Sequence, residues 1–230
     1  MKNWGSFVGI GAVVAVFVLG GAACSSMTNA AADAAGPGGG GAAGIDAAPS
    51  RDSRVVVNGY VTAGSWAGYG FTATDPGAAT IVPDCAGAAG CVPPFVGFDL
   101  CMHGTVTGRA DYTGFAMLGW NVNQPPTPGA AAGTWVVPDT GGITVSVLDN
   151  PSSTALRVQL QGTNPHVSTD RWCAPLVSGQ MIPWSAFRTE CWQTGGAALT
   201  PGTPIQQGSI IVPGLPADLP FDVCLIDLQM

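Results

Sequence analysis

The chain has 230 residues, of which seven are basic and fourteen acidic, and its formal net charge is −7 at neutral pH. An acidic chain lacks the basic surface that binds nucleic acids or anionic lipids, so we expect neither as a partner. Only 9% of the residues are charged. The surface must therefore consist of hydroxyl, amide and backbone groups, as is common in exported β-proteins.

The N-terminus has the features of an export signal. Lys2 precedes an apolar run over 7–23, which ends in small residues directly before Cys24. The run is shorter than a spanning helix requires and contains glycine. It resembles the signal of bacterial lipoproteins, although Gly21 stands where leucine is usual. We expect a signal peptide over 1–23 and a lipidated Cys24 that anchors the protein in the outer membrane or at the cell surface. Ordinary cleavage and secretion is the alternative.

A low-complexity segment follows over 24–52. It consists of alanine, glycine, proline and serine with scattered aspartate. Such a composition cannot bury a core, so we expect a flexible, disordered tether with a reach of about 30 Å. It would hold a folded domain, residues 53–230, away from the membrane.

The rest of the chain alternates between apolar and polar residues with a period of two. Runs of this kind cover 54–61, 115–124, 142–148, 156–161, 208–212 and 221–228, and a further strand begins at Cys101. Clusters of proline, glycine, asparagine and aspartate separate the runs, and no window shows a helical stripe. The pattern predicts an all-β, two-sheet β-sandwich.

The polar halves of three predicted strands form a candidate binding face. Their side chains are Asn121 and Asn123, then Thr144 and Ser146, then Arg157, Gln159 and Gln161. A solvated outer face is the simpler interpretation. Amides and guanidinium groups, however, offer planar donors and acceptors that suit the hydroxyls of sugars.

Aromatic residues supply the other half of a sugar site, because a sugar ring stacks on indole or phenol through its C–H face. Trp66 and Tyr69 lie in a glycine-rich segment without bulky neighbours, so we expect them to be exposed and to bind ligand. Most large aromatic residues are buried. We therefore expect core or loop packing for the tryptophans at 120, 172, 184 and 192.

Several motifs together resemble a known family. They lie at 120–124, 156–160, 171–175, 182–192 and 220–225. These motifs are similar to those of galactose-binding-like jelly-roll modules in exported proteins of myxobacteria and their relatives. The resemblance covers about 53–230. It implies a jelly-roll sandwich that binds carbohydrate, and it leaves the sugar open.

Six cysteines remain after Cys24, and an even number in an exported protein predicts up to three disulfides. The resemblance fits the pairs Cys101–Cys224 and Cys173–Cys191, which leaves Cys85–Cys91 as an additional staple. Jelly-roll modules of this kind also often hold a structural calcium ion, for which Asp222 and Asp227 are the nearest candidates. No other cofactor is expected.

Catalytic motifs are absent from the sequence. Glu190 is the only glutamate, and the aspartates lie mostly in turns, so a facing pair of carboxylates is not apparent. A non-catalytic module that binds a polysaccharide or glycan is the first hypothesis. An envelope or adhesion lipoprotein with a protein partner is the second, and an unrecognised polysaccharide hydrolase is the third.

Overall fold

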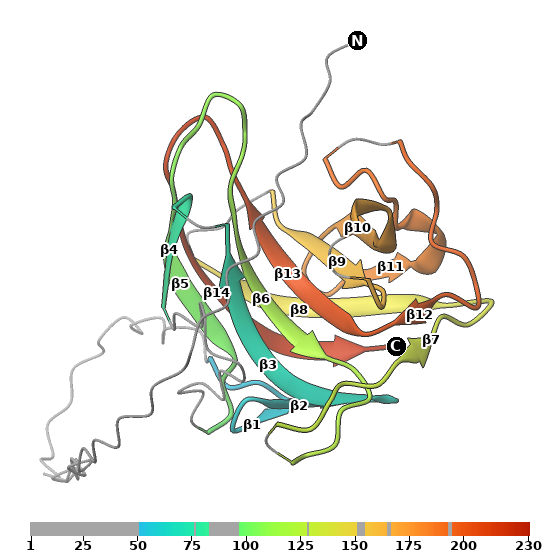
Figure 1. Cartoon of the computed structure of the whole chain (residues 1–230). Coiled ribbons are helices and arrows are strands. Elements are labelled where there is room, and N and C mark those ends of the chain that lie inside the picture. The colour runs from blue at the N-terminus through green and yellow to red at the C-terminus, as the bar shows by residue number, and fades with distance from the viewer. Residues whose placement is uncertain are drawn as a thin grey trace, which may run out of the picture. The chain divides into compact units, whose positions relative to one another are not determined.

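The alternating runs form β-strands (Figure 1). A computed structural model describes residues 51–75, 77–82, 97–127, 129–150, 155–164, 167–192 and 195–230. These residues belong to one compact unit, Ala47–Met230. The predicted signal peptide 1–23, the lipidation site Cys24, the tether up to residue 50 and the pair Cys85–Cys91 lie outside the described residues.

The strands form two large antiparallel sheets and one small sheet. The larger sheet has the order β1 (Val56–Val57), β2 (Tyr60–Ala63), β3 (Trp66–Thr74), β6 (Phe115–Asn121), β13 (Gln207–Pro213), β9 (Arg157–Gln161) and β10 (Arg171–Pro175). The second has the order β11 (Met181–Pro183), β8 (Gly142–Asp149), β14 (Leu219–Gln229), β5 (Cys101–Val106) and β4 (Ala79–Val82). A third sheet pairs β12 (Pro204–Ile205) with β7 (Trp135–Val136). Two 3-10 turns, η1 (Ser168–Asp170) and η2 (Trp184–Ala186), follow β9 and β11.

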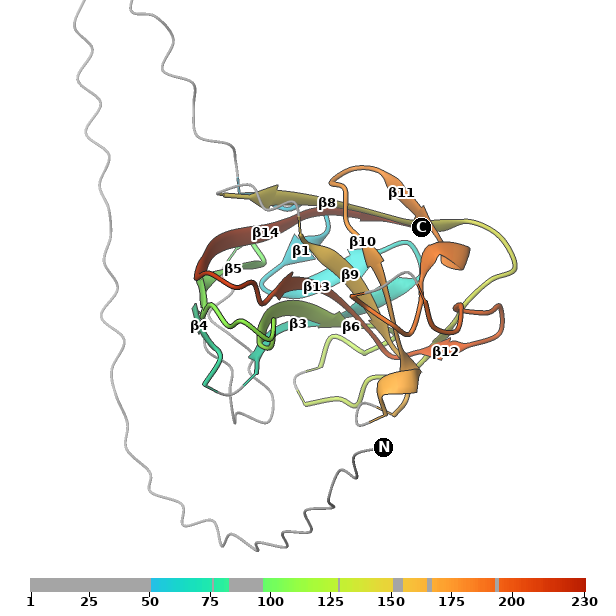
Figure 2. The same ribbon diagram turned by 90° about the horizontal axis from the view of Figure 1, so that it is seen from above.

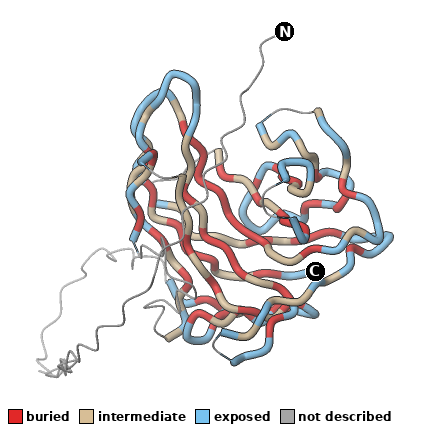
Figure 3. Tube along the Cα trace, in the orientation of Figure 1, coloured by how far each residue is buried: buried red, intermediate tan, exposed pale blue. Residues whose placement is uncertain are grey.

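The two large sheets pack face to face, with β8 and β14 in one layer and β3, β6 and β13 in the other (Figure 2). Buried residues lie along the strands and exposed residues gather in the loops (Figure 3). Trp120 on β6 is fully buried, and its register partners are Gly70 on β3 and Gly208 on β13. A Cβ atom at Gly208 would lie 2.8 Å from the indole, so glycine leaves the space that Trp120 fills. The predicted all-β, two-sheet sandwich is confirmed.

Aromatic rings connect several elements at one end of the core. Successive ring centroids are 6.4, 5.4, 5.4 and 6.2 Å apart. The rings are, in order, Trp120, Trp66, Trp135, Trp184 and Phe187. Tilted and edge-on aromatic contacts of this kind add to the stabilisation that burial provides.

The predicted strand over 54–61 is instead a tight hairpin. Val57 pairs with Tyr60, and Asn58 and Gly59 form the two-residue turn between β1 and β2. Both turn residues have positive φ, 48° and 73°, which asparagine and glycine tolerate better than other residues. Local turn chemistry therefore overrides the continuous apolar pattern.

Two of the predicted disulfides are present. Cys101 on β5 is bonded to its register partner Cys224 on β14, and Cys173 on β10 is bonded to Cys191. Disulfides of this kind indicate that the domain folds in an oxidising, extracytoplasmic environment. Within the described part of the chain, no helix has the length and apolar character needed to cross a bilayer.

Candidate binding site

The outer face of the larger sheet carries an ordered array of side chains on β6, β13, β9 and β10. Directly opposed residues of antiparallel strands point to the same face, so the register sorts the side chains into rows. The first row is Asn121, Gln207, Gln161 and Arg171; the second is Gly119, Ser209, Gln159 and Cys173; the third is Met117, Ile211, Arg157 and Pro175. The face therefore changes from amides at one end to larger apolar groups, with Arg157, at the other.

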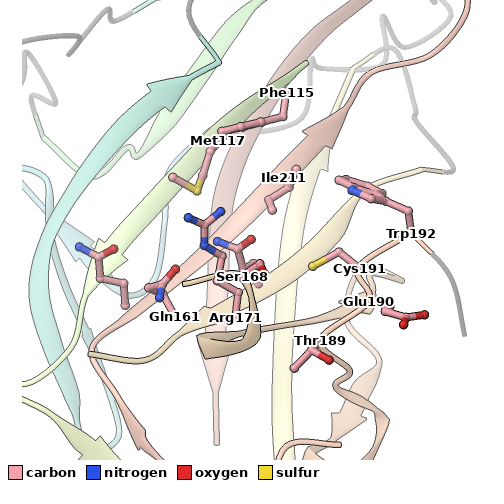
Figure 4. Close-up of a pocket in the computed structure, with 12 residues that line it drawn as sticks. Phe115, Met117, Gln161, Ser168, Arg171, Thr189, Glu190, Cys191, Trp192 and Ile211 are labelled. Carbon is pink, nitrogen blue, oxygen red and sulfur yellow. The ribbon is translucent and has the colours of Figure 1, made fainter. Parts of the chain in front are cut away.

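A pocket of about 530 Å³ lies over these rows (Figure 4). Gly119 in the middle row has no side chain, and the ring of its register partner Phe71 on β3 occupies the space next to it. The pocket is lined by Phe115, Met117, Gln159, Gln161, Ser168, Arg171, Thr189, Glu190, Cys191, Trp192, Gln207 and Ile211. Its volume falls within the range of small-molecule sites.

One wall of the pocket is attached to the floor by a disulfide. Cys173 belongs to the middle row, and its bond to Cys191 brings the segment 189–192 onto the outer face. Backbone hydrogen bonds from Cys173 N to Arg188 O, 2.8 Å, and from Arg188 N to Cys173 O, 3.0 Å, add to this attachment. The wall is thus held covalently and by backbone pairing at the same strand position.

Trp192 is the exposed aromatic residue of the pocket. Its side chain is 55% exposed, and the guanidinium carbon of Arg157 lies 5.2 Å from the centroid of its ring. A cation over an indole face is attracted by the ring's electrons. Partial burial lowers the pKa of the Arg157 guanidinium from its ordinary value, but an arginine remains protonated at neutral pH. Arg157 therefore holds the ring of Trp192 in place over the third row.

The side-chain amides of the first row are hydrogen-bonded within the protein. Gln207 Nε2 donates to Asn121 Oδ1 at 3.0 Å, and Asn121 Nδ2 donates to Gln124 Oε1 at 3.0 Å. Gln161 Nε2 donates to the carbonyl oxygen of Asp170 at 2.9 Å. These contacts fix the orientation of the amides, which leaves a preorganised polar edge on the pocket.

Four predicted ligand-binding residues do share one face. Alternation places Asn121, Arg157, Gln159 and Gln161 together on the outer surface of the larger sheet. However, β6 and β9 are not adjacent in the larger sheet, because β13 lies between them. The intervening strand supplies Gln207, Ser209 and Ile211 to the same surface.

The other predicted members of that face lie elsewhere. β6 ends at Asn121, and Asn123 follows in a turn with φ 47°, where its Nδ2 donates to Thr134 O at 2.9 Å. Thr144 and Ser146 belong to β8 in the second sheet. The prediction of a face shared by all three strands is therefore wrong for β8, because alternation reports the two sides of a strand and not the sheet that it joins.

The predicted exposure is wrong for two tryptophans, Trp66 and Trp192. Trp66 is fully buried, because it begins β3, an interior strand of the larger sheet, and its side chain faces the core. Tyr69 is half-buried with its ring edge-on to Tyr60, 4.9 Å away, and it does not line the pocket. The tryptophans at 120, 172 and 184 are buried as predicted, whereas Trp192 is exposed.

The two calcium candidates have protein partners. Asp222 forms an ion pair with Arg51, and Asp227 accepts hydrogen bonds from Leu228 N at 2.9 Å and Gln229 Nε2 at 2.7 Å. Among the residues that the structure describes, no three histidine, cysteine or acidic side chains form a group that could hold a metal ion. Calcium binding stays a prediction, which melting curves with and without a chelator test.

Sequence reasoning missed Arg171, Trp192 and the polar residues of β13. Gln207 and Ser209 alternate with inward residues, so the period-two rule applied to them as well. No local signal distinguishes Trp192, because Trp172 also adjoins a disulfide cysteine and is buried.

The sequence matches no protein-family model and no curated protein. Inferences about function therefore depend on the residues of the pocket.

Proposed function

We propose that this domain is a non-catalytic carbohydrate-binding module whose site is the pocket beneath Trp192. The observation that carries the proposal is the exposed indole of Trp192 held by Arg157 beside a floor of oriented amides. An indole offers a flat apolar surface to the C–H face of a sugar ring, and Gln159 and Gln207 offer donors and acceptors to its hydroxyls. Polysaccharides or cell-surface glycans are the expected partners.

A glycan array with the purified protein tests the proposal, and calorimetry then measures the affinity of the best ligand. Trp192→Ala should weaken binding about 10- to 100-fold, as expected for an aromatic residue at the centre of a site. Arg157→Ala should weaken it by about 1.5–3 kcal/mol, because it removes both a charged donor and the support of the indole. Trp184→Phe, a change at a buried tryptophan outside the pocket lining, serves as the control. Retention of full affinity by Trp192→Ala would exclude this site.

A protein partner is the second candidate. Phe115, Met117 and Ile211 form an apolar end of the pocket, and apolar surface of this kind also occurs in protein interfaces. A blank array, together with a partner whose capture Met117→Asp abolishes, would favour this alternative.

We further propose that the domain is held at the cell surface or outer membrane by a lipid on Cys24. A Cys24→Ser variant should move from the membrane fraction to the soluble fraction, because the acyl chains supply the membrane affinity. Its melting temperature should equal that of the wild type, since Cys24 lies outside the compact unit that begins at Ala47. Wild-type protein in the soluble fraction with a free thiol at Cys24 would contradict lipid anchoring.

A further inference from the structure

We infer that the sugar bound in this pocket is acidic and that its carboxylate is contacted by Arg171. This inference rests on the proposed carbohydrate-binding function and names the chemical class of the ligand. It comes from the placement of charge around the pocket, which differs from that of the chain as a whole.

Positive charge is scarce in this protein. Beyond the predicted signal peptide the chain has six arginines, no lysine and fourteen acidic residues. Two of these arginines, Arg157 and Arg171, lie at the pocket. The acidic residue that lines it is Glu190, which is exposed. A protein with net charge −7 repels anions at long range, so these arginines favour an anionic group through direct contact.

The position of Arg171 suits such a contact. It is the first residue of β10, in the same row as Gln161, and its side chain extends into the pocket (Figure 4). A guanidinium group presents a planar fork of donors that matches the two oxygens of a carboxylate. The neighbouring backbone is held, because Gly162 N donates to Asp170 O at 2.9 Å and Gln161 Nε2 donates to the same oxygen.

The carboxylate of Asp170, directly before Arg171, is occupied within its own loop. Its Oδ2 accepts a hydrogen bond from Asn164 N at 2.6 Å, and a Cβ atom at Gly162 would lie 2.1 Å from its Oδ1. Because residue 162 is glycine, the carboxylate of Asp170 can pack directly against the backbone at that position. The Asp170 carboxylate therefore shapes the loop that precedes β10.

The remaining walls fit a ring that bears one acidic substituent. Trp192 provides a stacking surface, Phe115 and Met117 provide an apolar end, and Gln159 and Gln207 provide amides for hydroxyls. A uronic acid combines these features, since it has an apolar ring face, hydroxyls and one carboxylate.

Calorimetry with matched ligands tests the inference on the full chain at pH 7. The probes are oligomers of galacturonic, glucuronic and mannuronic acid, each paired with its carboxyl-reduced, neutral counterpart. At least one acidic oligomer should bind at least about ten-fold more tightly than its neutral counterpart, which corresponds to one charge-assisted hydrogen bond. Its affinity should fall as sodium chloride is added.

Variants identify the residue responsible. Arg171→Gln should weaken binding of the acidic oligomer about 10- to 100-fold and that of its neutral counterpart by a clearly smaller factor, so that the preference for the acidic oligomer is lost. Glu190→Gln, at an exposed position on the rim, should strengthen acidic binding several-fold by removing a like charge. Arg54→Gln removes the same charge beside β1, at the opposite end of the sheet from β10, and should have no effect.

The outcomes separate the two proposals. Equal affinity for acidic and neutral members of every pair overturns the acidic ligand and leaves carbohydrate binding intact. Preference for acidic oligomers that survives in Arg171→Gln overturns the assigned contact. Absence of binding to all oligomers and to a glycan array overturns both proposals.

Discussion

Replacing Trp66 with alanine should lower the free energy of unfolding by about 3–5 kcal/mol. The side chain is fully buried, and its ring lies 5.4 Å from that of Trp135 and 6.4 Å from that of Trp120. Truncation removes buried apolar area and leaves a cavity between rings that belong to different strands, which limits their ability to close it. Urea denaturation followed by circular dichroism measures the change.

Trp192→Ala is the matched control for this substitution. The same side chain is removed from a position that is 55% exposed, where the loss is mainly the contact with Arg157. The free energy of unfolding should change by less than about 1 kcal/mol. Ligand affinity should show the opposite order, with a large loss in Trp192→Ala and little change in folded Trp66→Ala. Equal destabilisation by the two substitutions would contradict the assigned burial.

Removing the disulfide Cys173–Cys191 should weaken ligand binding by up to about 10- to 100-fold, as Trp192→Ala does, in a domain that remains folded. With both cysteines replaced by alanine, the covalent bond is lost and only the backbone hydrogen bonds of Arg188 connect this segment to β10, so Trp192 is held less firmly over Arg157. The bond spans 18 residues of sequence, for which loop-closure entropy predicts a loss of about 3 kcal/mol in stability. Calorimetry and circular dichroism at a temperature where the variant is folded measure the two effects.

The disulfide Cys101–Cys224 provides the comparison. It joins β5 to β14 in the second sheet across 123 residues of sequence, so its removal should cost more stability, about 5 kcal/mol in the same entropic treatment. The pocket is built on the larger sheet and should keep its affinity while the domain is folded. If both double variants lost affinity equally, the local attachment of Trp192 would not be what holds the site.

The strands themselves are local features and could be predicted from the sequence. The alternation over 142–148 appears as β8, Gly142–Asp149, and that over 156–161 appears as β9, Arg157–Gln161. Alternation depends only on the geometry of an extended chain, which places successive side chains on opposite faces. For the same reason it correctly placed Arg157, Gln159 and Gln161 on the opposite side from Val158 and Leu160.

Assembly of the pocket depends on pairings between distant segments. β13 inserts between β6 and β9, and β8 joins the other sheet, although all of these strands have similar patterns. Nothing local distinguishes their partners, because the backbone hydrogen bonds of any two such strands are alike. The composition of the polar floor was therefore only partly apparent from the sequence.

The sequence by itself determined the all-β class, the inward and outward sides of most strands and the cysteines available for pairing, because these follow from residue type and spacing. Only the tertiary structure decided which tryptophan is exposed. Trp66 lies among glycines yet faces the core from an interior strand, whereas Trp192 lies beside a cysteine that holds it at the surface. Exposure of a side chain depends on what packs over it, and the covering residues come from strands far away in the sequence.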